Sequence, residues 1–582
     1  MKAIISWLIR ALLTGLTVVV SCQLQLFACL VLMIILGNTT IAQEINPDDY
    51  AACEEKEWGQ LLWVMKLGAQ PIDDFTHFQC VDEQGVSADR YTLGFSGYFL
   101  GAEQYHKFPA WRGQIQETYD RVIRKMIRKP VWEYWSKESP GVTKFEPGGN
   151  RPYAPQTDPV AVRNIMYSGH LGMMINQYQV LYNDLKWDEP GSIVFQWDDK
   201  TVYVYDNESL QFAMFNQFIT NPVPGIECEP NAIFSACNQM PLLSWWYYDY
   251  LHGSRFFQAS QPLFSDWFKK VFINPETHGL AGFYLVKQGW VFAQWNPKYG
   301  NAFDGVIQGL IEKGANFYSP GNDGWTLTYM HAYDKKYVEE LWPYLKKMHV
   351  TVHPNGLATI NAPDVLMPDA DYGFFATLAA EVGDEEVKNG LLKYADSLFL
   401  PVWEDGTYHY PFMDKTATLN LAADGGAKPA EATPAETHPQ QEDGKGGQCC
   451  KRFNKMSNTP QHSDVSDRTL ALARALPKDG IYLMYNKPFD KTHFTEPAIT
   501  GVDLTKLILK RAIYDRNKQG LIISTYAKPE AGKTTIQIIN LDKSKSYTLS
   551  VNRKTTREIT GQDQHTLTID ASKAHDIILK EK

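Results

Sequence analysis

Five long stretches between residues 50 and 411 repeat their apolar side chains at intervals of three or four residues. This spacing predicts amphipathic helices rather than strands. Several stretches also end at a glycine or begin after Asp or Asn, as helix ends commonly do. The stretches span residues 114–135, 169–185, 240–253, 324–348 and 371–399. Consecutive amphipathic helices joined by short turns predict helical hairpins, arranged as a bundle, a solenoid or a closed toroid, and the spacing alone does not choose among these.

The last part of the chain changes to an alternation of apolar and polar residues. Short alternating runs separated by turn residues occupy 520–526, 534–541, 547–552, 565–570 and 575–580, which predicts a small antiparallel β domain over 510–582. Residues 412–462 are rich in Ala, Pro, Glu and Gly and have almost no large apolar side chains. Because such a segment cannot bury enough surface to offset its ordering, we expect a disordered insertion there. A returning helix over 466–476 lies within the connection formed by residues 463–509.

Residues 1–42 form a leader that begins with Lys2 and Arg10 and is almost wholly apolar as far as Gly37. This pattern indicates a secretory signal peptide. The apolar run is also long enough for residues 1–37 to form a retained membrane anchor, and residues 26–29 resemble a short lipoprotein cleavage box. All three interpretations place the body of the protein, which starts at residue 43, outside the cytoplasm, as a periplasmic, extracellular or membrane-anchored protein.

Charge and cysteine content exclude several classes of function. The formal net charge of −10 is opposite to that of a nucleic-acid-binding surface, so no nucleic-acid partner is expected. The eight cysteines include no CxxC pair and no spaced Cys/His set of the kind that binds zinc, so no metal site is predicted. Aromatic residues make up 13% of the chain. They suit either a thick helical core or a ring-lined pocket for sugars, isoprenoids or cations.

The segment GIECEPNAIFSACNQ, residues 225–239, contains Cys228 and Cys237. Pro230 can occupy the first position of a helix, so we expect a helix over 231–243, bent at Pro241, with Cys228 in the loop before it. A thiol near a helix N-terminus tends toward the thiolate, but the charges of Glu227 and Glu229 oppose this. Cys228 is therefore expected to be a neutral thiol that can donate a proton. A disulfide and two inert buried thiols are the alternatives.

His170 begins an apolar helix after Gly169. Its unperturbed pKa suits proton transfer at neutral pH, although a lone histidine on an apolar helix face is commonly a core residue with satisfied hydrogen bonds.

These two stretches resemble motifs of the linalool dehydratase/isomerase family. NIMYSGHLGMMINQYQVLYN, from residue 164, is similar to the family's Asn-Ile-Met-Tyr-x-Gly-His-Leu motif, and GIECEPNAIFSACNQ is similar to its Gly-Ile-x-Cys-Glu-Pro segment, with the second cysteine at the same offset. RYTLGFSGYFLGA (90–102) and DGWTLTYMHAYD (323–334) resemble two further helices of the family. The separation of the His and Cys motifs is wider here, which indicates an insertion near residues 187–201.

The resemblance implies an (α/α)6 barrel in a homo-oligomer, and a cofactor-free lyase or isomerase that removes water from a tertiary allylic alcohol or adds it to an alkene. It places His170, Cys228 and Cys237 among the catalytic residues. The family also uses an aspartate of a neighbouring subunit, for which Asp73 or Asp74 is available, and Gln79 stands where the family has a tyrosine. Another family tyrosine is replaced by Gly321. The residues implied to bind substrate are Tyr91, Met166, Glu229 and Trp325.

Two other functions remain open from the sequence. An exported polysaccharide lyase or glycoside hydrolase also combines a helical toroid with a β domain. It would need a carboxylate pair, for which Glu227 with Glu229 or Asp371 is available, or a set of Tyr, His and Arg side chains. A non-catalytic protein that holds a hydrophobic ligand in an aromatic pocket is the third possibility.

Overall fold

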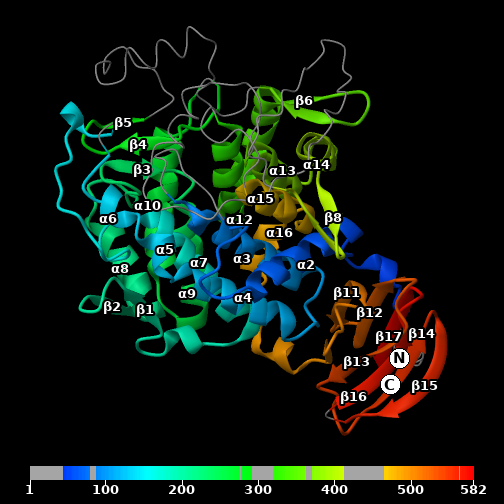
Figure 1. Cartoon of the computed structure of the whole chain (residues 1–582). Coiled ribbons are helices and arrows are strands. Elements are labelled where there is room, and N and C mark those ends of the chain that lie inside the picture. The colour runs from blue at the N-terminus through cyan, green and yellow to red at the C-terminus, as the bar shows by residue number, and fades with distance from the viewer. Residues whose placement is uncertain are drawn as a thin grey trace, which may run out of the picture.

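The computed structural model describes residues 44–78, 87–142, 145–275, 277–291, 319–361, 370–411, 464–562 and 564–582, and it consists of a helical body and a smaller lobe of β-strands (Figure 1). The predicted leader, the predicted insertion at 412–462 and Gln79 lie outside these residues. In the part of the chain that is described, no helix is long and apolar enough to cross a membrane. The described residues are mainly helical and also form small antiparallel sheets, as the residue spacing predicts.

Six helices pack one on the next in a closed order, α3 on α7, α7 on α9, α9 on α12, α12 on α13, α13 on α15, and α15 back on α3. Two of them, α3 and α7, are buried on almost every side, which is the burial expected of helices that are enclosed by others. Their bounds are Asp89–His106 (α3), Ile165–Tyr182 (α7), Gln239–His252 (α9), Pro320–His349 (α12), Ala370–Val382 (α13) and Asp464–Ala475 (α15).

The remaining helices cover this set from outside. α4 illustrates the pattern, because Ile115, Tyr119 and Val122 are buried at the predicted spacing while Arg124 lies at the surface. The covering helices are α2 (Glu55–Ala69), α4 (Gln114–Met126), α8 (Asn207–Thr220), α10 (Phe256–Val271), α14 (Glu385–Phe399) and α16 (Gly480–Asn486), with two short turns of helix at α5 (Lys129–Trp132) and α6 (Trp135–Glu138). The predicted helices over 114–135, 169–185, 240–253, 324–348, 371–399 and 466–476 are confirmed in type, although the first is divided among α4, α5 and the start of α6, the fourth is broken at Asp334, and the fifth is divided into α13 and α14.

The helical body also contains short strands that helical periodicity does not predict. The hairpin of β1 (Ile193–Gln196) and β2 (Val202–Tyr205) falls at the predicted insertion near residues 187–201. The other strands are β3 (Ala232–Phe234), β4 (Phe283–Leu285), β5 (Trp290–Val291), β6 (Val350–Val352), β7 (Ala358–Ile360), β8 (Val402–Glu404) and β9 (Thr407–His409).

The predicted helix from Pro230 is wrong. Residues 232–234 form β3, which pairs antiparallel with β4, and Asn231 has a left-handed backbone (φ 74°) that no continuous helix contains. The helix α9 starts only at Gln239, so Pro241 lies in its first turn, where a missing N–H breaks no hydrogen bond, and it causes no bend. The strand partner lies about fifty residues further along the chain, which local spacing cannot reveal.

The C-terminal strands form two antiparallel sheets, one of order β11-β12-β17-β14-β15 and one of order β10-β13-β16. The first strand of this lobe is Ala498–Thr500, so the strands begin before the expected boundary at residue 510. Backbone hydrogen bonds join the lobe to the helical body, from Ile499 N to Ala110 O at 2.7 Å and from Cys53 N to Lys510 O at 2.8 Å. The strands are β10 (Ala498–Thr500), β11 (Ile508–Asp515), β12 (Gly520–Tyr526), β13 (Lys533–Ile539), β14 (Ser546–Val551), β15 (Lys554–Thr560), β16 (Gln564–Asp570) and β17 (His575–Glu581).

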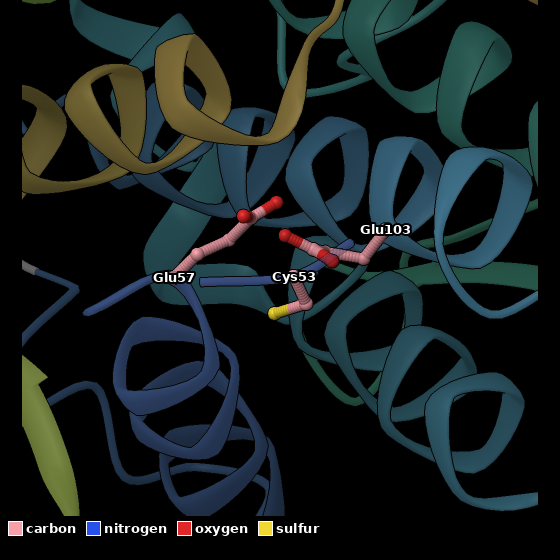
Figure 2. A group of neighbouring side chains, drawn as sticks. All are labelled: Cys53, Glu57 and Glu103. Carbon is pink, nitrogen blue, oxygen red and sulfur yellow. The ribbon is translucent and has the colours of Figure 1, made fainter. Parts of the chain in front are cut away.

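Close to this junction lies a buried group of charged side chains. Figure 2 shows the carboxyl groups of Glu57 and Glu103 facing one another beside Cys53. Lys107 Nζ is 2.5 Å from Glu57 Oε1 and also donates to the carbonyl of Ala475. Burial, and then the charge of Glu57, hold the pKa of Glu103 well above its usual range, so one ammonium, one carboxylate and one protonated carboxyl group balance each other inside the protein.

Candidate functional site

His170 lies on α7 with none of its surface exposed, pressed against α3. Its Nδ1 is 2.8 Å from the hydroxyl of Tyr98, a residue of α3. The close contact requires a glycine, because a Cβ at Gly94 would lie only 2.7 Å from His170 Nδ1. The ring of His170 is therefore held in one orientation by the two innermost helices.

His170 is a neutral imidazole. Burial, and then the charge of Arg90, lower its pKa to about 3. The Tyr98 hydroxyl is also 3.4 Å from the sulfur of Met240, but an imidazole nitrogen is the stronger acceptor, so we assign the Tyr98 proton to Nδ1. His170 Nε2 then carries the ring proton. It has no hydrogen-bond partner within the described residues and can donate to a ligand oxygen.

The loop that carries Cys228 is fastened to the helix of His170. Asn164 N donates to Cys228 O at 3.0 Å, and Ile165 N donates to Glu227 O at 3.3 Å. These bonds satisfy two N–H groups at the start of α7, which have no partner inside the helix. The side chain of Asn238, next to Cys237, accepts from Ile226 N at 2.7 Å and donates to Ile226 O at 2.9 Å. The two cysteine segments are thus held together and against α7.

Cys228 and Cys237 are free thiols, with 1% and 5% of their surfaces exposed. The pKa of Cys228 is well above its ordinary value, because burial, and then a hydrogen bond with the Cys237 thiol, disfavour the thiolate. The expectation of a neutral Cys228 therefore agrees with the structure, although the expected cause is secondary. Glu229 contributes less than burial, and the carboxylate of Glu227 is paired with Arg163 at 2.7 Å.

Aromatic rings surround the imidazole. The ring of Tyr91 lies 5.5 Å from the rings of both His170 and Trp325, edge to face in each case. Trp325, at the start of α12, stacks on Phe374 of α13 with a centroid separation of 5.1 Å. Phe95 lies 5.2 Å from Trp325. Such rings can stabilise positive charge and exclude water.

The other residues named from the sequence differ in their placement. Met166 is buried, and its sulfur is 3.4 Å from Arg90 Nη2. Glu229 is also buried, in the turn that leads into β3. By contrast, the side chain of Asp73 is 58% exposed and pairs with Arg128 at 2.6 Å. Within one chain, Asp73 is therefore not beside His170, and any role at the site requires a second subunit, as the resemblance implies.

Sequence reasoning did not single out Tyr98, Arg90, Phe95 or Phe374. Three of these lie on α3, within the quoted stretch RYTLGFSGYFLGA, at positions one, four and seven residues from Tyr91. Helical spacing places residues that are three or four apart on one face, so this signal was present around Tyr91. Phe374 comes from α13, and nothing in the sequence relates it to Trp325.

Together these segments bring two buried free thiols, of which Cys228 is held neutral, near one neutral imidazole and several aromatic rings. Such groups suit proton transfer to and from a neutral organic molecule rather than the binding of an ionic substrate.

The family profile described as linalool dehydratase/isomerase matches residues 90–313 and 303–416 of this chain. The match covers more than half of the sequence, and the chain belongs to the linalool dehydratase/isomerase family. It includes α3 from its second residue, α7, the cysteine segment, α12 and α13, and so every residue placed above around His170.

The matches to solved structures include three of low similarity. A crystal structure of an unsaturated glucuronyl hydrolase specific for heparin has 11% identity and a TM-score of 0.38, covering 74% of this chain and 96% of its own. An α-mannanase of glycoside hydrolase family 76 from Bacteroides thetaiotaomicron has 11% identity and a TM-score of 0.37, covering 75% and 98%. A β-arabinofuranosidase of family 127 has 8% identity and a TM-score of 0.26, covering 91% and 79%.

Proposed function

We propose that this protein is a hydro-lyase and isomerase that removes water from a tertiary allylic alcohol of isoprenoid type, or adds water to the corresponding alkene, without a cofactor. The observation that carries the proposal is the pair of buried free thiols, with Cys228 held neutral, in segments that are fastened to the helix of His170. Family membership supports the same chemistry, and the closed order of six helices supports an (α/α)6 barrel around it.

The first step is departure of the hydroxyl group. Hydroxide is a poor leaving group, so Cys228 transfers its thiol proton to the substrate oxygen as the C–O bond breaks, which releases water and leaves a Cys228 thiolate. The Nε2–H of His170 donates a hydrogen bond to the same oxygen and orients it. A raised thiol pKa keeps the proton on Cys228 until the substrate takes it.

The second step returns the proton. The Cys228 thiolate takes the proton of the Cys237 thiol, whose sulfur removes a proton from the carbon next to the allylic system, which forms the new double bond and restores both thiols. The faces of Tyr91 and Trp325 stabilise the positive charge that develops on the substrate by about 0.5–2 kcal/mol each. The fixed positive charge of Arg90 instead destabilises a cation on the substrate. This favours a reaction in which the two proton transfers are coupled and no long-lived cation forms.

The carbohydrate-active alternative has less support. Its proposed carboxylate pair would need two groups that face a common substrate. Glu227 is instead neutralised by Arg163.

The experiment is to incubate reduced protein with tertiary allylic alcohols, saturated primary alcohols and unsaturated glycans, and to analyse the products by gas and liquid chromatography. We expect time-dependent formation of alkene or rearranged alcohol from the tertiary allylic alcohols only. Cleavage of a glycan, with none of the alcohols converted, would overturn the proposal.

A further inference from the structure

A second group of ionisable side chains, separate from the thiol site, meets where α12, α13 and α16 converge. His331 and Glu339 belong to α12, Glu381 to α13, and Asp479 is the residue before α16. One nitrogen or oxygen atom from each of His331, Glu339 and Asp479 lies within 4.8 Å of the other two. The proposed dehydration mechanism uses none of these residues.

A break in α12 brings two of these side chains together. Residues eight positions apart in a straight α-helix are separated by about 12 Å along its axis. Yet His331 Nε2 is 3.9 Å from Glu339 Oε1. The backbone between them leaves the helical conformation at Asp334 (φ −138°, ψ 49°), and the second half of α12 is thereby redirected. The break positions Glu339 beside the buried imidazole.

The other ring nitrogen of His331 is fixed by Glu381. Nδ1 is 2.9 Å from Glu381 Oε1, and the same carboxylate accepts from Ile481 N at 2.8 Å and Tyr482 N at 2.9 Å. Because Glu381 acts as an acceptor for two N–H groups, Nδ1 donates to it. The lone pair of Nε2 then points at two carboxylates. A carboxylate behind the histidine is the arrangement that commonly orients metal-binding imidazoles.

Two of the inward-facing atoms lack a hydrogen-bond partner. His331 is fully buried, and among the described residues its Nε2 has none, with Asp479 Oδ1 at 4.0 Å. Asp479 Oδ1 is likewise buried and without one. In the singly protonated ring the Nε2 lone pair faces two carboxylates that repel it, and a cation bound between them would relieve this repulsion.

The local charge indicates a divalent cation. Lys335 Nζ pairs with Asp479 Oδ2 at 2.7 Å and approaches Glu339 at 3.9 Å. Among the described side chains named here, this one ammonium stands against three carboxylates, those of Glu339, Asp479 and Glu381, so two negative charges remain. The side chains of Glu339 and Asp479 are 40% and 21% exposed, which gives an ion and a water ligand access from solvent.

We propose that His331, Glu339 and Asp479 bind a divalent first-row transition ion, with Zn²⁺ as the best fit, and that the ion fastens the two halves of α12 to α16. Tetrahedral ligands at about 2.1 Å from zinc lie about 3.4 Å apart. The partly exposed carboxylates therefore need to move inward by less than about 1.5 Å to reach this geometry. The competing arrangement is a second proton on His331, which would make the group an ordinary ion-pair cluster.

The test is Zn²⁺ titration of tag-free, metal-depleted full-length protein by calorimetry, with metal content measured after dialysis. We expect one saturable site per chain and a higher melting temperature with Zn²⁺. Glu339→Gln and Asp479→Asn should each weaken binding by at least about tenfold, and asparagine tolerates the left-handed backbone at 479 (φ 59°). The matched control is Glu340→Gln, because Glu340 is 61% exposed and pairs with Lys336.

Co²⁺ in place of Zn²⁺ distinguishes this site from the cysteines, because thiolate ligands add a strong charge-transfer absorption and the proposed ligands do not. Lys335→Met removes the competing ammonium and should tighten binding. Two results would overturn the proposal: no saturable uptake, or uptake that is the same in Glu339→Gln, Asp479→Asn and Glu340→Gln.

Discussion

At the scale of single residues, the surroundings of His170 decide its charge. Because burial and the charge of Arg90 lower its pKa to about 3, the imidazole stays neutral in the folded protein over the whole physiological range. The unfolded chain has the ordinary pKa near 6.5. Between these two pH values the unfolded state binds one more proton than the folded state. The contribution of His170 to the free energy of unfolding is therefore fully present above pH 6.5 and is lost as the pH falls toward 3.

Replacement of His170 should therefore flatten the acid side of the stability curve. Between pH 7 and pH 5 this one group lowers the free energy of unfolding by about 2 kcal/mol. We expect His170→Gln to lose about 2 kcal/mol less than the wild type over that interval, whatever its stability at pH 7, as measured by urea unfolding at both pH values. An equal loss in the two proteins would show that His170 titrates normally.

The residue scale also marks the limit of sequence-based prediction. His170, Cys228 and Cys237 could be named because they stand in specific motifs, and the neutral state of Cys228 could be argued from its neighbours. Tyr98 could not be paired with His170, because that contact depends on how closely α3 and α7 approach. Asp73 illustrates another limit. It is exposed within one chain, and this position neither supports nor contradicts the role in a neighbouring subunit that the resemblance implies.

At the scale of elements, glycines set the distance between the inner helices. A Cβ at Gly94 would lie 2.7 Å from His170 Nδ1. Replacement of a helical glycine by alanine stabilises the helix by about 0.5–1 kcal/mol, but the overpacking destabilises the folded protein by about 1–3 kcal/mol. We expect Gly94→Ala to destabilise the protein modestly and to lower turnover sharply, because the His170–Tyr98 hydrogen bond is displaced.

The control for this prediction is Gly390→Ala in α14. Its Cβ would lie 2.7 Å from the Cβ of Ala358, so it introduces a similar clash away from His170. It should lower stability while the turnover per folded molecule stays unchanged. Equal turnover in Gly94→Ala and the wild type would contradict the packing proposed for His170.

The buried group formed by Glu57, Glu103 and Lys107 joins α2 and α3 to the end of α15. Removing the ammonium leaves an uncompensated charge on Glu57, so Lys107→Met should lower the free energy of unfolding by about 3–5 kcal/mol. Glu103→Gln should change it by less than about 1 kcal/mol, because the amide replaces a carboxyl group that is already neutral and can still donate to Glu57. Denaturant unfolding at pH 7 measures both values, and a comparable loss for Glu103→Gln would show that Glu103 is ionised.

Helices could be predicted at this scale because each amphipathic segment carries its own spacing. Strand β3 could not, since its partner β4 is distant in sequence and the segment around Pro230 also satisfies a rule for helix starts. The break in α12 at Asp334 left no signal either, because the apolar spacing continues across it.

At the scale of the whole molecule, we propose that the active site is completed by a second copy of the chain. Asp73 lies at the surface, and its exposed pair with Arg128 contributes little to stability. Because the proposal places Asp73 in the neighbouring subunit's site, Asp73→Asn should lower turnover strongly, and because the exposed pair contributes little to stability, the melting temperature should not change. Co-assembly of Asp73→Asn with His170→Gln subunits should restore about one quarter of wild-type activity, because that share of randomly mixed interfaces combines two intact residues.

Activity assays on the co-expressed and co-purified mixture measure this recovery, and the separately purified variants mixed at high dilution serve as the control. Full activity of Asp73→Asn alone would contradict a role for Asp73. A mixture with no recovery would place both residues in the same subunit's site or outside it.

The most direct test of the proton-transferring thiol pair is the rate at which a tertiary allylic alcohol is converted to alkene. The rate is measured by gas chromatography with four reduced proteins: the wild type, Cys228→Ala, Cys237→Ala and Cys53→Ala. Cys53 is a buried thiol outside the site and controls for the loss of a cysteine as such. We predict that the rate falls by at least about 100-fold in Cys228→Ala and Cys237→Ala and is unchanged in Cys53→Ala. Wild-type rates in folded Cys228→Ala and Cys237→Ala proteins would contradict the proposed mechanism.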